Sequence, residues 1–220
     1  MDALWTLDGD ETSWAAWAED MAQAPASLLV TEWVAAFRID RPGWALDVGC
    51  GTGRAFRPLA EAGYRVVGLD PVGRGLRLAR DRALTDGLAA WSIQGTAARL
   101  PFRTASVALV LGMSVLFHLS PGELEESLRE ISRVLLPDGK ALLHFLDVGD
   151  WRRNLARQIS PGQAPVPGYR AVVTCFCPAE ILRDWVEAAG LRVESLELKT
   201  SRSESGEQRN WFLQCSRSEK

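Results

Sequence analysis

Residues 45–54, read as Ala-Leu-Asp-Val-Gly-Cys-Gly-Thr-Gly-Arg, constrain the fold of this chain more than any other stretch. A short apolar run ends in three glycines at alternate positions, Gly49, Gly51 and Gly53, and a helix-like segment follows at residues 56–62. This order predicts a strand, a tight turn and the start of a helix. Because glycine adopts backbone conformations closed to other residues, a ligand can lie against the main chain here. We therefore predict a ligand-binding site at this turn.

The spacing of the glycines narrows the choice of ligand. A dinucleotide-binding fingerprint has the pattern GxGxxG, and its third glycine would fall at position 54, which is Arg54. The phosphate-binding P-loop pattern fails as well, because no Gly-Lys-Ser or Gly-Lys-Thr follows. A carboxylate, Asp47, stands two residues before the first glycine. Since an anion disfavours bound phosphates, the pattern is more compatible with a cationic ligand.

The composition fits one α/β domain of 220 residues with a small cap. A formal net charge of −3 gives no basic signature for nucleic-acid or membrane binding. We therefore expect a small-molecule substrate and no nucleic-acid or membrane partner, with monomer and homodimer both open.

Several sequence features bear on the cellular compartment of the protein. The acidic N-terminus lacks a basic signal-peptide start, and no apolar run reaches the roughly 20 residues of a membrane span. The four cysteines are expected to be free thiols, because a domain of this size needs no disulfides. These features predict a cytoplasmic protein.

A second candidate site residue, Asp70, ends the strand predicted at residues 64–70. In parallel sheets ligands collect at the carboxyl ends of strands, where a carboxylate can accept hydrogen bonds from both hydroxyls of a ribose. The same aspartate could instead cap the helix predicted at residues 72–84. The two roles are compatible, and we expect ribose binding.

At these residues the sequence resembles the class I S-adenosylmethionine-dependent methyltransferases. Residues 47–53, Asp-Val-Gly-Cys-Gly-Thr-Gly, are similar to their first motif, and Asp70 followed by Pro71 is similar to their second. The resemblance implies S-adenosylmethionine as the cofactor and S-adenosylhomocysteine as its product.

The resemblance continues along the chain. Residues 95–102, Gly-Thr-Ala-Ala-Arg-Leu-Pro-Phe, are similar to the third motif, although Thr96 replaces an acid that usually faces the adenine amino group. Contacts to adenine would then fall to Thr96 or to the backbone of Ala97. Residues 112–119 resemble the segment that lines the cofactor's sulfur and the substrate, and residues 131–145 resemble the "RVLKPGG" block.

The resemblance implies an α/β fold, a Rossmann-like, doubly wound sheet of seven strands that is mostly parallel, with an antiparallel C-terminal hairpin strand and helices on both faces. It implies one domain over residues 1–220 with an N-terminal helical lid at 1–40, and the length and proline content of residues 147–174 predict a substrate cap there. The aromatic residues of segment 1–40 could instead simply pack on the sheet. The implied cofactor-binding residues are Asp47, Gly49, Cys50, Gly51, Gly53, Asp70, Pro71, Thr96, Ala97, Met113 and Phe117.

Periodic apolar patterns and turn residues predict the other elements. Ser120-Pro121-Gly122-Glu123 has the form of a capping box with proline at the first helical position, so a helix should begin there. The remaining predictions are helices at residues 12–21 and 29–37, a turn at 137–139 before a strand at 140–146, a helix between 178 and 190, and strands at 191–198 and 210–215 joined by a polar loop at 201–208.

Methyl transfer from a sulfonium is an in-line displacement in which positioning supplies much of the rate, and a general base helps when the acceptor carries a proton. His118 follows the strand predicted from the apolar run at residues 106–112, near the expected substrate, whereas His144 lies inside the fifth predicted strand, at 140–146, where a histidine is usually a packed residue. Asp147 and Asp150, just past the fifth strand, are alternatives. We therefore predict His118 and Asp147 as catalytic residues.

The predicted function is methyl transfer to an oxygen, nitrogen or carbon atom of a small molecule. One alternative is a non-catalytic, S-adenosylmethionine-binding regulatory protein, which the exchange at Thr96 makes conceivable. Another is a thiol or arsenite methyltransferase that uses Cys175 and Cys177, which share a face if their segment is extended. Because these two cysteines lack the CxxC spacing of a zinc site, we expect no metal and a structural role for both.

Overall fold

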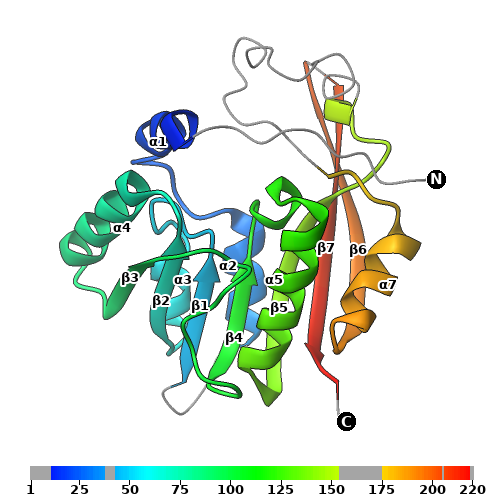
Figure 1. The fold of residues 1–220 in the computed structure, drawn as a ribbon. Coiled ribbons are helices and arrows are strands. Elements are labelled where there is room, and N and C mark those ends of the chain that lie inside the picture. The colour runs from blue at the N-terminus through cyan, green and yellow to red at the C-terminus, as the bar shows by residue number, and fades with distance from the viewer. Residues whose placement is uncertain (1–10, 38–42, 154–174, 205, 219–220) are drawn as a thin grey trace.

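The computed structural model describes residues 11–37, 43–153, 175–204 and 206–218. Seven strands of this described part form one sheet with helices packed around it (Figure 1). The strands are β1 (Trp44–Val48), β2 (Arg65–Asp70), β3 (Ala90–Gln94), β4 (Val107–Gly112), β5 (Leu135–Leu146), β6 (Leu191–Ser203) and β7 (Gly206–Arg217). The helices are α1 (Glu11–Asp20), α2 (Leu28–Ala36), α3 (Phe56–Glu61), α4 (Gly73–Thr85), the 3-10 helix η1 (Leu116–His118), α5 (Pro121–Val134) and α7 (Ala179–Ala188).

The strand order is β3-β2-β1-β4-β5-β7-β6. Strands β1 to β5 pair in parallel, and β7 runs antiparallel between β5 and β6. The predicted seven-stranded mixed sheet is therefore confirmed. The winding reverses at β1, which lies between β2 and β4, and such a reversal opens a crevice at the carboxyl ends of the strands.

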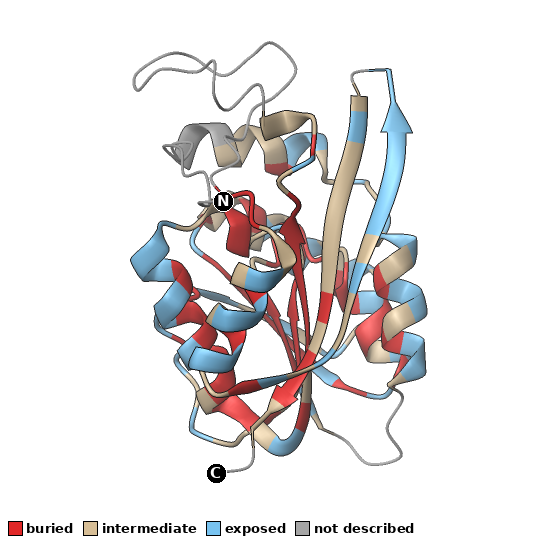
Figure 2. Ribbon diagram, turned by 90° about the vertical axis from the view of Figure 1, so that its right-hand side faces the viewer, coloured by how far each residue is buried: buried red, intermediate tan, exposed pale blue. Residues whose placement is uncertain are grey.

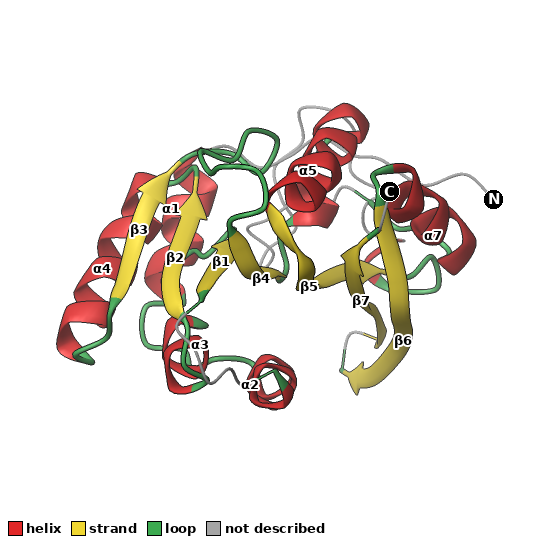
Figure 3. Ribbon diagram, turned by 90° about the horizontal axis from the view of Figure 1, so that it is seen from below, coloured by secondary structure: helices red, strands yellow, loops and turns green. Residues whose placement is uncertain are grey.

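Helices cover the sheet on both faces, with α2 and α3 on one side and α5 and α7 on the other (Figure 3). A strand covered in this way needs an unbroken apolar run, and β4 supplies one with Val107, Leu109, Val110 and Leu111 all buried. Figure 2 shows the buried residues concentrated in the central strands, whereas the far end of the β6–β7 ribbon is intermediate or exposed. The core thus holds the strand ends of the predicted site in fixed positions.

Local sequence signals place several helices correctly. Helix α5 begins at the predicted capping box, where the backbone N–H of Ser120 donates to Glu123 Oε2 at 3.0 Å. Helix α2 covers most of the helix predicted at residues 29–37, but it buries Val30 and Val34, whereas Trp33 of the apolar pattern is only partly buried. The α2 residue Trp33 donates from Nε1 to Gln214 Oε1 at 3.3 Å, so this helix is fastened to β7. None of the described helices is long and apolar enough to cross a membrane.

Two predicted strand boundaries are wrong. Strand β5 begins at Leu135, ahead of the predicted turn at 137–139, because Leu135 pairs with Val107 before the register shifts. The polar loop predicted at 201–208 is instead the end of a ribbon that turns between Ser203 and Gly206. A ribbon outside the core needs no apolar face. Its polar residues therefore show no apolar alternation, and they were predicted as a loop.

Gly68 in β2 provides a test of how tightly the core is packed. A Cβ atom there would lie 2.6 Å from both Cys50 Sγ and Phe56 Cζ, which is too close for either neighbour. We expect Gly68→Ala to lower the free energy of unfolding by about 1–3 kcal/mol through overpacking. Urea denaturation followed by circular dichroism measures this loss.

The matched control is Gly122→Ala, because a Cβ atom at Gly122 meets nothing within 4 Å and alanine favours helix α5. This variant should be as stable as the wild type or slightly more stable. Equal stability of both variants would contradict the close packing around Gly68.

Candidate functional site

The glycine turn after β1 has the backbone geometry that its sequence predicts. Gly49, Gly51 and Gly53 have φ angles of +69°, +50° and +70°, in the left-handed region that side chains disfavour. The N–H of Gly49 donates to the carbonyl of Leu69 at 2.7 Å. A Cβ atom on Gly49 would lie 2.5 Å from Val115 Cβ, so the turn is wedged between β2 and the loop after β4.

Asp70, at the carboxyl end of β2, braces this turn. Its Oδ2 accepts a hydrogen bond from the N–H of Gly51 at 2.9 Å, and its Oδ1 accepts one from the N–H of Val72 at 2.8 Å. The N-cap residue of α4 is Val72, so the alternative that Asp70 is the N-cap of this helix is wrong. Each carboxylate oxygen keeps a lone pair for a further donor, such as a ribose hydroxyl.

Asp47, in β1, is a second buried carboxylate beside the turn. Only 4% of the residue is exposed, and its pKa is raised to about 7, chiefly by burial and further by the negative charge of Asp70. The guanidinium of Arg54 acts in the opposite direction. The negative charges of these two acids repel each other, and a cationic ligand bound between them would reduce that repulsion.

The other predicted cofactor residues lie around the same strand ends. The Cys50 side chain is buried beside Gly68, and burial followed by the charge of Asp47 raises the pKa of its thiol. Exposed Pro71 accepts from the amide of Gln94 through its carbonyl, at 2.9 Å. Thr96 is exposed.

The loop after β3 is tied to Asp70 as well. The N–H of Gly95 donates to the Asp70 carbonyl at 3.2 Å, and Ala97 is buried. Beyond β4, Met113 packs at the edge of the core on the α2 side, and Phe117 is buried. All predicted cofactor residues therefore lie on the ends of β1 to β4 or on the loops that follow them.

The two predicted catalytic residues have different surroundings. The His118 ring lies edge to face with Trp14, with ring centroids 4.7 Å apart, so it sits under α1. Asp147 is buried, and its Oδ1 accepts from Arg209 Nε at 2.6 Å and from the N–H of Gly149 at 2.9 Å. The role of His118 and of Asp147 as a general base stays a prediction.

Helix α1 lies over the glycine turn and beside α4 (Figure 1). A Cβ atom on Gly51 would lie 3.1 Å from the Trp17 ring, and the guanidinium of Arg54 lies 5.6 Å from the centre of that ring. Glu19 forms an ion pair with Arg74 of α4. The lid expected of residues 1–40 stays a prediction, and residues 1–10 and 38–40 lie outside the described residues. Most of the predicted cap at 147–174 also lies outside them.

The cysteine pair after the predicted cap is packed in the core. Cys175 and Cys177 are fully buried, and a hydrogen bond with Cys177, together with burial, raises the pKa of the Cys175 thiol. A raised pKa disfavours the thiolate that binds metals and arsenite. In the part of the chain that the structure describes, no three His, Cys, Asp or Glu side chains gather as a metal site.

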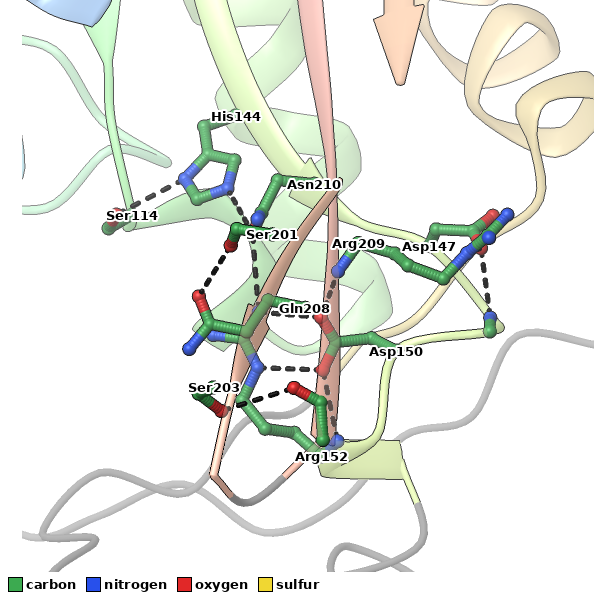
Figure 4. A network of polar contacts seen from close by, with 12 residues as sticks. Ser114, His144, Asp147, Asp150, Arg152, Ser201, Ser203, Gln208, Arg209 and Asn210 are labelled. Carbon is green, nitrogen blue, oxygen red and sulfur yellow. Dashed lines mark hydrogen bonds and ion pairs between the residues drawn. The ribbon is translucent and has the colours of Figure 1, made fainter. Parts of the chain in front are cut away.

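A polar network that the sequence did not predict lies beside the site (Figure 4). His144, expected to be packed, is buried, and its ring nitrogens contact Ser114 and Asn210. Burial lowers the pKa of His144 to about 4. Ser114 and Asn210 lie 30 and 66 residues from His144 in the sequence, so no local pattern could have linked them.

A doubly wound sheet with a glycine turn and two buried acids at its strand ends defines a protein of the Rossmann-like class. Residues 46–143 match the family described as "Methyltransferase domain". An uncharacterized methyltransferase of Bacillus subtilis, YodH, is 42% identical over 94 residues, which cover 43% of this chain and 39% of the relative. Over residues 46–143, which are less than half of the chain, the sequence is therefore similar to class I S-adenosylmethionine-dependent methyltransferases.

Solved structures share the fold over nearly the whole chain. A methyltransferase of Burkholderia thailandensis with bound 1,6-didemethyltoxoflavin and S-adenosylhomocysteine covers 95% of this chain and is itself covered to 87%, with a TM-score of 0.70 and 18% identity. The [4+2]-cyclase SpnF covers 99% of this chain and is itself covered to 99%, with a TM-score of 0.73 and 18% identity. By contrast, the matches to the first curated relatives span only 29% to 42% of those proteins.

The raised pKa of Asp47 predicts how stability depends on pH. The folded protein holds the Asp47 proton up to a pH of about 7, whereas the unfolded chain releases it near the ordinary value of 3.8. Stability is therefore lost as the pH rises from about 4 to about 7, and Asp47→Asn should escape a loss of up to about 4 kcal/mol. Urea denaturation at pH 4.5 and pH 7.5 measures the difference between the two proteins.

The control for this experiment is Asp138→Asn, which removes an exposed acid. This variant should follow the pH dependence of the wild type. If Asp47→Asn follows the wild type too, Asp47 ionises normally in the folded protein.

Proposed function

We propose that this protein is an S-adenosylmethionine-dependent methyltransferase that acts on a small-molecule acceptor. The observation that carries the proposal is the glycine turn of β1 with two buried carboxylates, Asp47 and Asp70, at adjacent strand ends. This arrangement offers main-chain contact, negative charge and ribose-binding oxygens in one place.

The donor set fits the cofactor. A cation near Asp47 favours the charged carboxylate and so opposes the effect of burial. Asp70 holds the ribose, and Thr96 with Ala97 borders the adenine. Met113 and Phe117 lie on the loop that packs on Gly49, where the sulfonium belongs, and an aromatic face favours a cation.

The bound cofactor supplies an activated methyl group on a positively charged sulfur. With the cofactor bound, the acceptor's lone pair would form the new bond to carbon, the carbon–sulfur electron pair would stay with sulfur, and the acceptor's proton would pass to a base or to water. The chain's own contribution is to hold both partners in line and to keep water away, which α1 does on the side of the glycine turn. His118 lies under that helix, so it remains the preferred base of the two proposed.

A small acceptor is supported by the Burkholderia structure, which holds 1,6-didemethyltoxoflavin. A cytoplasmic location is supported by the four free and buried cysteines, which suit a reducing compartment. Use of Cys175 and Cys177 in arsenite methylation is not supported, because the raised pKa of the Cys175 thiol disfavours its reactive form.

A second candidate is a protein that binds the cofactor without transferring its methyl group. It is favoured by one observation, that a [4+2]-cyclase shares the fold over 99% of this chain. Binding and turnover must therefore be measured separately.

Calorimetric titration with S-adenosylmethionine tests the cofactor site. The wild type should release heat on binding, and Asp70→Asn should weaken the affinity at least about tenfold, because bonds to a charged group are each worth about 1.5–3 kcal/mol. Circular dichroism checks that the variant is folded. The control, Asp81→Asn, removes an exposed acid of α4 and should bind as the wild type does.

If the wild type releases no heat with S-adenosylmethionine, the proposed cofactor binding is contradicted. If the cofactor binds, transfer of a radiolabelled methyl group to a panel of metabolites separates an enzyme from a binding protein, since the latter never labels an acceptor.

A further inference from the structure

Ser114, His144 and Asn210 form a hydrogen-bonded row (Figure 4). Ser114 follows β4, His144 lies in β5 and Asn210 in β7. Ser114 Oγ lies 3.1 Å from His144 Nδ1, and His144 Nε2 lies 3.1 Å from Asn210 Oδ1. The three residues come from three neighbouring elements, so the fold and not local sequence assembles them.

The direction of each hydrogen bond follows from Arg152. Its Nη2 donates to Asn210 Oδ1 at 3.2 Å, and because arginine can only donate, this atom is the acceptor oxygen of the amide. His144 Nε2 contacts the same oxygen and therefore carries the imidazole proton. Because burial lowers the pKa of His144 to about 4, the ring is neutral at pH 7 and Nδ1 holds a lone pair. The hydroxyl of Ser114 must donate to that lone pair.

The row is held rigidly at its inner end. Asp150 is buried and accepts from Arg152 Nε and Nη2, both at 2.7 Å, in a bidentate ion pair. The His144 ring stacks on Phe212 with centroids 5.0 Å apart and meets Phe117 edge to face at 5.2 Å. The imidazole can therefore neither rotate nor exchange its tautomer without breaking these contacts.

The outer end of the row, Ser114, is exposed next to the glycine turn. Its neighbour Val115 packs on Gly49, which places Ser114 one residue from the wall of the proposed cofactor site. Ser114 has a φ angle of +57°, a conformation that costs a non-glycine residue about 1–2 kcal/mol. Strain of this kind persists where the surrounding structure fixes a residue, often at functional sites.

We propose that Ser114 binds the methyl acceptor through a hydrogen bond donated by an O–H or N–H group of that acceptor, and that His144 is a positioning residue that fixes the direction of the Ser114 hydroxyl. This inference rests on the proposed function. The only proton of the hydroxyl is committed to His144, so Ser114 Oγ offers lone pairs alone. The site therefore selects acceptors with a donor group, and an acceptor whose oxygen bears no proton gains nothing there.

Nuclear magnetic resonance of the ¹⁵N-labelled histidine side chains tests the positioning role in the protein alone. The chain has two histidines, so one substitution, His118→Gln, assigns both. At pH 7 the His144 shifts should show a protonated Nε2 and a bare Nδ1, and Ser114→Gly should shift the Nδ1 signal. A protonated Nδ1, or a charged ring at pH 7, would overturn the assignment.

Acceptor recognition is tested with phenol, a donor, and anisole, its methyl ether, on protein saturated with S-adenosylhomocysteine. Phenol should shift the His144 signals with an affinity at least about tenfold tighter than that of anisole, as expected for one hydrogen bond. In Ser114→Gly the two probes should bind alike. Equal binding of both probes to the wild type, or an unchanged preference in the variant, would overturn the proposal.

Ala105→Gly is the matched control, because Ala105 is the other described non-glycine residue with a positive φ, at 52°. It relieves backbone strain in the same way but removes no hydroxyl, so it should keep the preference for phenol. Saturation with S-adenosylhomocysteine is checked first by calorimetry. A protein that fails that check contradicts the proposed function, whereas a protein that passes it and treats both probes alike contradicts only the role of Ser114.

Discussion

Two hydrogen bonds to the carboxylate of Asp70 hold the site together. The N–H groups of Gly51 and Val72 donate to its two oxygens at 2.9 and 2.8 Å, which ties the glycine turn of β1 to the start of α4. Glycines alone would leave the turn free to move, since each has many accessible backbone states. The buried carboxylate removes that freedom, so the main chain is already arranged when a ligand arrives.

The two buried carboxylates of the site lower the stability of the fold but serve the binding of a ligand. Asp47 and Asp70 are buried at adjacent strand ends, and the pKa of both is raised, first of all by burial. A core of uncharged residues at these positions would be more stable, but it would offer nothing to a cation or to a ribose. The fold tolerates the two acids because Leu46, Val48 and Leu69 anchor the flanking strands in the core. The apolar interior thus offsets the cost of the polar edge.

Sequence patterns predicted those parts of the molecule whose cause is local. The strand, turn and helix around residues 44–61 follow from an apolar run and three glycines, and α5 follows from its capping box. The extent of the β6–β7 ribbon did not follow, because its exposed end lacks the alternation that burial imposes. Nor did the row from Ser114 to Asn210, since it exists only when three neighbouring strands bring their ends together.

The β6–β7 ribbon and the row from Ser114 to Asn210 meet in the first half of β7. Arg209 and Asn210 lie toward the far end of β7, where β5 gives way to the loop that carries Asp147 and Asp150. Only an extended β7 carries its main chain that far, where the N–H of Arg209 meets Asp150 Oδ2 at 2.6 Å. Asn210 falls inside the strand predicted at residues 210–215, but its contact with His144 follows only from the antiparallel pairing of β5 with β7. That contact fixes His144 and, through it, the direction of the Ser114 hydroxyl.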